Sequence, residues 1–257
     1  MLLDSFSVKN QVIIITGSSS GIGMDCAKYF LELGAKVCIN GRKEDRLKHA
    51  LNELEDYGKS VIGVVADGRN DTEVQALVHQ VIERFGKVDV LINNAGGSFP
   101  IKAEQLSSNG FNAVLQTNLN TVFHFSKAVL PYFKEQGKGK VINISSVAGL
   151  QATPNEAHYG SSKAAVNHLT KTLAQEWGEY NIQVNAIAPG PIMTQIAEEH
   201  LWSNPEKKSK VESQIALGRI GSTKDVFYAC LYLASPASDY VTGTILSVDG
   251  GTRGIMG

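Results

Sequence analysis

The sequence predicts an α/β fold in which a parallel sheet is covered by helices on both faces. Short aliphatic runs alternate with segments of helical periodicity along the chain, which is typical of βαβ units. The runs are nearly continuous in valine and isoleucine, as in "QVIIIT" at 11–16, and strands buried on both faces have this composition. A glycine-rich turn separates the first run from the first helical segment. Together these observations predict a doubly wound, Rossmann-like sheet of about seven strands.

The individual elements follow from the same pattern. The first helical segment ends at Gly34, because glycine commonly terminates helices. The second, "EDRLKHALNELEDYG", is amphipathic. We predict strands over 11–16, 36–40, 60–66, 88–93, 140–145, 182–188 and 244–250. We predict helices over 23–34, 44–58, about 71–85, about 111–136, 158–178 and about 223–234.

The 257 residues are expected to form a single domain, 1–257, that holds both the dinucleotide-binding and the catalytic site. No linker, repeat or low-complexity tract marks a second domain. One stretch, 189–222, is long, polar and without clear periodicity. A long insert in a compact domain is often a lid or a binding loop, so we predict a substrate-binding loop over 190–215.

Charge and cysteine content narrow the class of protein. The 24 basic and 25 acidic residues give a formal net charge of -1, which calls for neither a nucleic acid nor an anionic membrane as partner. The first residues have neither the basic nor the apolar region of a signal peptide. Three isolated cysteines, Cys26, Cys38 and Cys230, show no metal-ligand spacing and are expected to be buried free thiols. A cytoplasmic protein with a small-molecule substrate is the prediction.

The glycine-rich turn "TGSSSGIG" spans Thr16 to Gly23. It departs from the G-x-G-x-x-G fingerprint, yet Gly17, Gly21 and Gly23 still allow a tight turn and a close approach of backbone to a pyrophosphate. The start of the following helix offers free N–H groups, and the hydroxyls of Ser18, Ser19 and Ser20 could donate to phosphate. The alternative is a plain glycine-rich turn; its position between strand and helix favours nucleotide binding.

Tyr159 stands four residues before Lys163 in "HYGSSKAAV", and this spacing puts both side chains on one face of a helix. Such a pair is common and by itself indicates little. Carbonyl reduction, however, needs an acid that protonates the developing alkoxide, and free tyrosine has a pKa of about 10. A positive charge about 4 Å away is worth about 4 kcal/mol at an effective dielectric of about 20, enough to lower that pKa by about 3 units. Lys163 is predicted to supply this charge.

Further motifs complete a pattern that resembles the short-chain dehydrogenase/reductase family, in its compact one-domain branch. The glycine turn is followed by "NNAG" at Asn93–Gly96, by Asn118, and by Ser146 in "NISS". Tyr159 and Lys163 come next, then Pro189-Gly190 with Thr194, and "VDGG" at 248–251. The motifs occur in the family's order across nearly the whole chain.

The resemblance implies a catalytic set of Asn118, Ser146, Tyr159 and Lys163. Tyr159 would be the acid and base, Ser146 would bind the substrate oxygen, and Lys163 would also bind the nicotinamide ribose. Asn118 would hold a water that relays protons toward Lys163. Ser146 is chosen over Ser145 because the family's interval to the tyrosine is thirteen residues. Asn93 would steady the central strands.

The resemblance and the chain's own residues together predict an NADP(H) site. The second strand ends in "CINGRK" without an acidic residue, and an arginine pairs with a 2′-phosphate, so Arg42 favours NADP(H) over NAD(H). Asp67 could accept from the adenine amino group or cap a helix. The predicted cofactor-binding residues are Gly17, Ser19, Ser20, Gly21, Ile22, Gly23, Arg42, Asp67, Asn94, Ala95, Gly96, Tyr159, Lys163, Pro189, Gly190 and Thr194.

The sequence also predicts a substrate class and the residues that would contact the substrate. Its wall would come from 97–99, 151–158 and the 190–215 loop, with Ser98, His158, Met193 and Trp202 as candidate contacts. A carbonyl reductase acting on 3-oxoacyl thioesters is the leading expectation. The alternatives are a sugar-acid or steroid dehydrogenase, an enoyl-thioester reductase, and a non-catalytic cofactor-binding scaffold.

The resemblance also implies a homotetramer that pairs the two long predicted helices, 111–136 and 158–178. Both helices carry apolar residues on more than one face. Examples are Val122, Phe125, Val129, Leu169 and Leu173, which could equally belong to the core.

Overall fold

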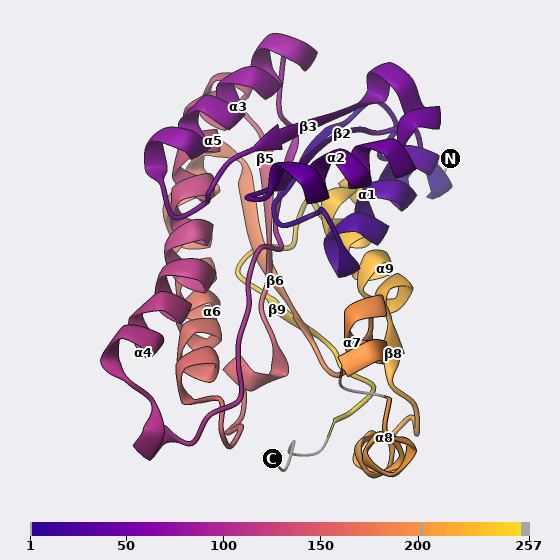
Figure 1. The fold of residues 1–257 in the computed structure, drawn as a ribbon. Coiled ribbons are helices and arrows are strands. Elements are labelled where there is room, and N and C mark those ends of the chain that lie inside the picture. Colours follow the sequence, from indigo (N-terminus) through magenta and orange to yellow (C-terminus); the bar gives the residue numbers. More distant parts are fainter. Residues whose placement is uncertain (1, 201–202, 253–257) are drawn as a thin grey trace.

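The computed structural model describes residues 2–200 and 203–252, and within them the predicted α/β fold is confirmed (Figure 1). Seven parallel strands form one sheet in the order β3-β2-β1-β4-β5-β6-β9. The order reverses between β1 and β4, which makes a crevice at the carboxyl ends of these strands. The strands are β1 (Val12–Ile15), β2 (Lys36–Gly41), β3 (Val61–Val65), β4 (Val90–Asn93), β5 (Gly139–Ile144), β6 (Ile182–Pro189) and β9 (Ile245–Val248).

Helices cover both faces of this sheet. One core cluster joins it to α1 (Gly21–Glu32), α2 (Glu44–Glu53) and α9 (Thr223–Ala234). The other joins it to α3 (Asp71–Phe85), α5 (Thr121–Gln136) and α6 (Ala157–Trp177). Figure 1 shows the two groups on opposite sides of the strands. The chain is therefore a three-layer structure.

The side chains of β1 show why valine and isoleucine runs build this sheet. Val12 and Ile14 belong to the core cluster on the α3, α5 and α6 side, whereas Ile13 and Ile15 belong to the other cluster. All four are fully buried. Because successive strand residues face opposite sides, both sets of side chains in β1 pack against helices, which favours apolar residues at every position.

Two predicted helices differ in detail. The second helix ends at Glu53, and a 3-10 segment, Glu55–Ser60, follows in place of its last turn because Gly58 takes a positive φ of 50°. The helix expected over 111–136 begins earlier, as α4 (Ser108–Leu115), and reaches α5 through a π-helical turn at Gln116–Asn120. Ser107 sets the earlier start, since its side chain caps α4.

The segment expected to be an irregular loop contains regular structure. Ile192–Met193 (β7) pairs with Gly221–Ser222 (β8) in a small parallel sheet. Two short helices lie between them, α7 (Gln195–His200) and α8 (Pro205–Glu212). In Figure 1 these helices project below the carboxyl end of the main sheet.

A buried chain of polar side chains ties the central strands to the helices behind them. The Asn93 amide donates to Asn143 Oδ1 at 2.9 Å and to Ser126 Oγ on α5 at 3.2 Å. The Asn143 amide donates to Thr170 Oγ1 on α6 at 2.9 Å. All four residues are buried, with at most 1% of their surface exposed. The position of Asn93 agrees with the predicted role in steadying β4 and β5.

The three cysteines are buried free thiols, as predicted. Burial raises the pKa of Cys38 to about 12. Among the residues that the structure describes, no helix combines the length and hydropathy needed to cross a bilayer.

The Asn143 network generates the first testable prediction. We expect Asn143→Ala to lower the free energy of unfolding by about 2 kcal/mol, because it leaves buried donors and acceptors of Asn93 and Thr170 without a partner. Urea unfolding followed by circular dichroism measures the change. The control is Asn112→Ala on the exposed surface of α4. A loss no larger than that of the control would contradict the role of the network.

Candidate active site

A cavity of about 380 Å³ opens at the crevice where the strand order reverses. The glycine loop forms its floor, and glycine is required there by packing. A Cβ on Gly17, whose φ is +61°, would lie 2.7 Å from Ala95 Cα. A Cβ on Gly23 would lie 2.9 Å from Gly17 O and from Ser18 Cα. The loop therefore packs directly on the turn after β4, and its backbone is open to a ligand.

Thr16 clamps these two turns together. Its buried hydroxyl accepts from the backbone N–H groups of Asn94 at 3.0 Å and Ala95 at 2.9 Å. The Asn94 amide donates in turn to Thr16 O and Gly17 O, each at 3.0 Å. Thr16 was not among the predicted site residues. Its position as the first residue of the glycine motif was the sequence feature that could have indicated a role in the site.

The three serines of the loop have different surroundings. Ser18 is fully buried; its hydroxyl donates to Ile15 O at 2.6 Å and accepts from Asn40 N at 2.9 Å. The expectation that Ser18 donates to phosphate was therefore wrong, because its hydroxyl joins β1 to β2. Ser19 and Ser20 do line the cavity. Ser20 is the N-cap of α1 and makes no side-chain cap, so the first N–H groups of α1 can meet an anion.

Three cations stand at the end of β2 and the start of α2. Arg42, Lys43 and Arg46 line the cavity and are exposed, and none has an ion pair or side-chain hydrogen bond within the described residues. Arg46 was missed from the sequence; it lies in the first turn of α2, whereas Arg42 precedes the helix.

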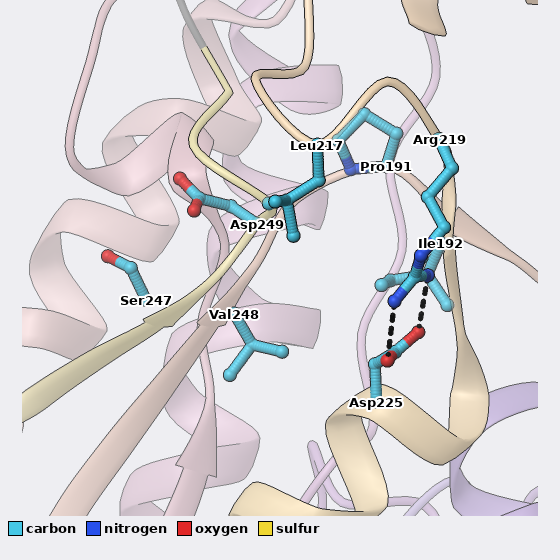
Figure 2. A pocket seen from close by; sticks show the side chains of 10 residues that line it. Pro191, Ile192, Leu217, Arg219, Asp225, Ser247, Val248 and Asp249 are labelled. Atoms are coloured by element: carbon cyan, nitrogen blue, oxygen red, sulfur yellow. Dashed lines mark hydrogen bonds and ion pairs between the residues drawn. The ribbon is translucent and has the colours of Figure 1, made fainter.

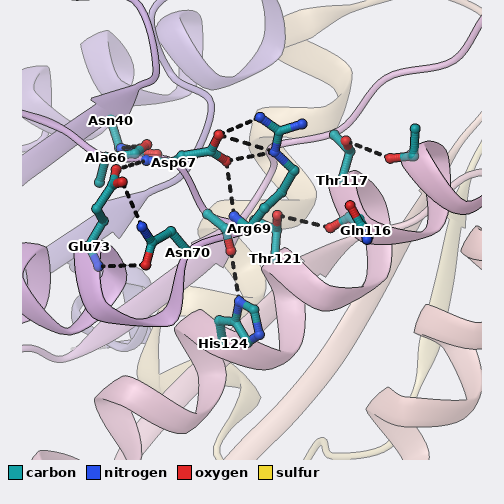
Figure 3. A network of polar contacts seen from close by, with 12 residues as sticks. Asn40, Ala66, Asp67, Arg69, Asn70, Glu73, Gln116, Thr117, Thr121 and His124 are labelled. Atoms are coloured by element: carbon teal, nitrogen blue, oxygen red, sulfur yellow. Dashed lines mark hydrogen bonds and ion pairs between the residues drawn. The ribbon is translucent and has the colours of Figure 1, made fainter.

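Asp67 follows β3 and lines the same cavity. It does not cap α3, since Asn70 does so by accepting from Thr72 N and Glu73 N. Its carboxylate instead holds the Arg69 guanidinium, with Nη2 2.5 Å from Oδ2, as Figure 3 shows. This charge-assisted contact keeps the pKa of Asp67 below its usual range. Arg69 was also missed, and nothing in its sequence position indicated the pair.

A second cavity of about 270 Å³ adjoins the first. Gly96, Ser146, Tyr159 and Lys163 line it, and it shares Ile22, Asn94, Gly96 and Thr194 with the first cavity. Sequence-distant residues of β4, β5 and α6 thus meet at the carboxyl edge of the sheet. Three of the four predicted catalytic side chains surround one space that is continuous with the nucleotide-sized cavity.

Lys163 enters this space from α6 and is 3% exposed. Its Nζ donates to Ile144 O at 2.7 Å and lies 5.7 Å from the centre of the Tyr159 ring. Burial lowers the pKa of Lys163 to about 8. One N–H of the ammonium is fixed by the strand end, which leaves two for groups in the cavity.

The Tyr159 phenol differs from the sequence-based expectation. Burial raises the pKa of Tyr159 above its usual value, and the negative charge of Glu156 raises it further. The hydrogen bond with Ser146 lowers this pKa, but by less. The expected lowering by Lys163 is not what the structure shows, because desolvation of the phenolate is the larger effect. A neutral phenol beside the Ser146 hydroxyl is suited to donate a proton.

The Asn118 side chain makes protein contacts that the sequence did not predict. It is fully buried in the π-helical turn, where Oδ1 accepts from Gly97 N at 2.8 Å. Its amide nitrogen donates to Gly97 O at 3.1 Å and to Ser162 Oγ at 2.9 Å. The side chain thus fastens the turn after β4 to α6, and the predicted part of Asn118 in holding a water stays a prediction. Ser162 was missed as its partner.

The predicted substrate contacts are only partly brought together. Ser98 lines the second cavity, and its hydroxyl donates to Glu156. His158 is fully buried against the Phe99 ring, with centroids 4.5 Å apart, and does not line this cavity. Met193 is half-buried in β7 and does not line the second cavity either, whereas the adjacent Ile192 and Thr194 do. Trp202 lies outside the described residues.

Pro189, Gly190 and Thr194 carry the chain from β6 past both parts of the site. Gly190 packs on Asp249, where a Cβ would lie 2.9 Å from Asp249 Cα. Thr194 lines both cavities. Its Oγ1 accepts from Ala197 N at 3.1 Å at the start of α7. These contacts fix the start of the predicted substrate loop against the site.

The far end of this loop is held by an ion pair. Arg219 donates to Asp225 at 2.9 and 3.0 Å, and both residues line a small cavity together with Val248 of β9 (Figure 2). Asp225 also completes a capping box with Ser222 at the start of α9, and these contacts keep its pKa well below the usual range. The pair anchors the return of the 190–215 segment to the domain.

The residues that line the two cavities fit a dinucleotide that carries a reactive ring at one end. The glycine floor lacks room for side chains, the first turn of α1 is open to a phosphate, and the cations lie at one end. The buried Lys163 and the Tyr159 phenol lie at the other end. These features define an oxidoreductase that uses a nicotinamide cofactor on a carbonyl or alcohol group.

Comparison with known proteins identifies the family. Residues 17–253 match the family model described as Enoyl-(Acyl carrier protein) reductase. The chain belongs to the short-chain dehydrogenase/reductase family, and the resemblance seen in the sequence is confirmed.

Relatives in this family act on different substrates. The chain is 39% identical to a 3alpha-hydroxysteroid dehydrogenase of Mediterraneibacter gnavus, over 96% of this chain and 98% of that protein. It is 36% identical to the 3-oxoacyl-[acyl-carrier-protein] reductase FabG of Thermotoga maritima, over 95% of this chain and 98% of that protein. The names therefore leave the substrate of this chain open.

Two solved structures share the whole fold. A 7 alpha-hydroxysteroid dehydrogenase complexed with NADH and 7-oxo glycochenodeoxycholic acid has a TM-score of 0.93 and 34% identity, covering 99% of each chain. A gluconate 5-dehydrogenase from Burkholderia cenocepacia in complex with NADP and tartrate has a TM-score of 0.91 and 33% identity, covering 98% of each chain. Neighbours of this fold thus include complexes with either cofactor.

The burial of Lys163 generates a prediction about pH. With a pKa of about 8 against an ordinary value of 10.5, Lys163 binds fewer protons in the folded than in the unfolded chain between these values. We therefore expect it to make the free energy of unfolding rise with pH across this window, by up to about 3 kcal/mol. Chemical unfolding at about pH 7.5 and about pH 10, without cofactor, measures this rise.

Lys163→Met is expected to lack that rise, while the exposed control Lys48→Met keeps it. Groups away from Lys163 titrate alike in the three proteins, so the difference reports on Lys163 and the Tyr159 phenol beside it. Parallel stability profiles for Lys163→Met and the wild type would show that the ammonium is not desolvated.

Proposed function

We propose that this chain is an NADP(H)-dependent reductase that converts a carbonyl group to a secondary alcohol. One observation carries the proposal: Ser146, Tyr159 and Lys163 line a single cavity that joins the cavity of the glycine loop. A cofactor bound along the glycine loop reaches into the space that these three side chains surround. A scaffold would have no use for a buried lysine held next to a phenol.

Each side chain has a distinct part in the proposed reaction. The nicotinamide, when bound, supplies or takes up the hydride at the carbonyl carbon. Tyr159 gives its hydroxyl proton to the oxygen as negative charge develops there, and Ser146 donates a hydrogen bond to the same oxygen. Lys163 uses its remaining N–H groups to hold ribose hydroxyls and places positive charge near the phenol. Asn118 and Ser162 keep α6 and the β4 turn in register.

The raised pKa of Tyr159 favours the reductive direction. A phenol that is hard to ionise remains protonated near neutral pH and can donate as soon as an alkoxide forms. Alcohol oxidation needs the phenolate, which burial disfavours. The positive charge of Lys163 and of an oxidised nicotinamide would act against this burial effect when both are present.

The choice of NADP(H) rests on the charges at the end of β2. Arg42, Lys43 and Arg46 face the cavity without counter-ions among the described residues, and Asp67, the nearby carboxylate, is paired with Arg69. A 2′-phosphate supplies the missing negative charge, whereas a ribose hydroxyl supplies none. The gluconate 5-dehydrogenase complexed with NADP supports this choice. Because the 7 alpha-hydroxysteroid dehydrogenase is complexed with NADH, the choice is tested by experiment below.

We propose 3-oxoacyl thioesters as the leading substrate class, supported by the FabG of Thermotoga maritima and by the description of the matched family model. A hydroxysteroid or its ketone is the second candidate. It is favoured by the 39% identity to the steroid dehydrogenase and by two exposed apolar side chains, Phe99 and Leu150, on the turns near the site.

The reaction is tested by following NADPH and NADH absorbance with purified protein. The substrates are an acetoacetyl thioester, a keto steroid, a keto sugar acid and an enoyl thioester. We expect turnover of the acetoacetyl thioester with NADPH. Tyr159→Phe should lower kcat by about 100-fold or more while NADPH binding is kept, because only the transferable proton is lost.

The matched control is Tyr240→Phe, which removes a hydroxyl from a fully exposed ring. Turnover of the keto steroid or the keto sugar acid alone would change the proposed substrate class but leave the proposed mechanism unchanged. Full activity of Tyr159→Phe, or reduction of the enoyl thioester alone, would refute the proposed acid. NADPH binding without turnover of any carbonyl would favour the scaffold alternative.

We also propose a homotetramer. The positions first considered for the interface, Val122, Phe125, Val129 and Leu173, are buried in the core of the chain itself. Support comes instead from Phe123 on α5, which is 45% exposed, and from β9, an edge strand whose Ile245, Leu246 and Val248 are only half-buried. An apolar edge strand is a surface that proteins usually cover. Sedimentation velocity is expected to give four chains, and a monomer would refute the proposal.

A further inference from the structure

We propose that Arg69 sets the cofactor preference of this site by occupying the Asp67 carboxylate until a 2′-phosphate draws it away. The inference rests on the proposed NADP(H) function and deepens it. A cofactor without the phosphate must compete with Arg69 for Asp67, whereas a phosphorylated one attracts Arg69 to itself. The Asp67–Arg69 pair would thus act against NAD(H), in addition to the attraction that Arg42 offers NADP(H).

The first support is the geometry of the pair. Asp67 Oδ1 accepts from Arg69 N at 3.0 Å and from Nε at 2.9 Å. Oδ2 accepts from Nε at 3.1 Å and from Nη2 at 2.5 Å. Each carboxylate oxygen therefore already receives two donors from Arg69, which fills the four acceptor positions that a carboxylate offers. An adenine amino group can use Asp67 only if the guanidinium moves.

The second support is that the backbone of this turn is fixed while the Arg69 side chain is free to move. Asp67 N donates to Glu73 Oε2 at 2.8 Å, and His124 Nδ1 lies 2.9 Å from Gly68 O (Figure 3). Gly68 is packed so closely on Thr121 that a Cβ would overlap it. The Arg69 side chain, by contrast, is 42% exposed, and within residues 2–200 and 203–252 it hydrogen-bonds and ion-pairs with Asp67 alone. Release of Asp67 therefore requires only a rotamer change at Arg69.

The third support is the charge around the cavity. Arg42, Lys43, Arg46 and Arg69 all line it, together with one carboxylate, Asp67. Arg42 is close enough to lower the pKa of Asp67, which places the pair within reach of the β2 cations. A phosphate dianion in their midst competes with Asp67 for Arg69, since a guanidinium binds phosphate through the same two-donor fork.

The test is the ratio of the dissociation constants for NADH and NADPH, measured by fluorescence titration at low salt. Arg69→Ala is expected to tighten NADH binding, because Asp67 is freed, and to lower the NADPH preference about fivefold, the scale of one exposed ion pair. The fragments 5′-AMP and 2′,5′-ADP should show the same change, which confines it to the adenine end. Arg42→Ala should lower the ratio by weakening NADPH instead.

Lys28→Ala is the control; it removes an exposed positive charge from α1 outside the cavity and should leave the ratio unchanged. Arg69→Lys keeps the charge without the two-donor fork, and its ratio is expected between those of the wild type and Arg69→Ala. An unchanged ratio in Arg69→Ala, with the wild type preferring NADPH, would overturn this inference alone. A wild type that binds NADH as tightly as NADPH would overturn the proposed cofactor choice and this inference together.

Discussion

The site depends on one constraint: the glycine loop after β1 must lie directly on the turn after β4. There is no room for a side chain between them at Gly17, and the Thr16 hydroxyl accepts from two backbone N–H groups of the β4 turn. Because β1 and β4 flank the point where strand order reverses, this contact brings the dinucleotide floor and the catalytic edge into one surface. Asn118 then fastens the β4 turn to α6, which carries Tyr159 and Lys163.

Desolvation is the second organising effect, and it shifts the pKa values of the two proposed catalytic groups in opposite directions. It lowers the pKa of Lys163 and raises that of Tyr159, so both shifts favour the neutral forms. A carboxylate nearby, Glu156, strengthens the effect on the phenol. The site is therefore set to hold a proton on Tyr159 before chemistry begins. The simple charge argument from the sequence considered the attraction of Lys163 and left out the burial that both residues share.

Much of the architecture was predictable because it depends on periodic patterns. All seven strands of the main sheet and the three-layer arrangement follow from aliphatic runs that alternate with helical segments. The π-helical turn at 116–120 was not predictable, since residues of a π turn have no periodicity of their own and Asn118 reveals its use only through Gly97 and Ser162. Ser18 was misassigned for a similar reason: three adjacent serines look alike until the packing of β1 against β2 buries one of them.

The distribution of charge gives the cofactor a direction. The exposed cations Arg42, Lys43 and Arg46 lie at the end of β2. Among the described residues that line the second cavity, the one cation is Lys163, which is buried and bound to Ile144 O. A phosphate placed beside Tyr159 would adjoin a desolvated phenol and would feel the negative charge of Glu156, both unfavourable for an anion. The adenosine end is therefore proposed to lie beside β2 and the ring end beside Tyr159. Electrostatics and the shape of the glycine floor favour the same orientation, in which a hydride-transferring ring would face the proposed proton donor Tyr159.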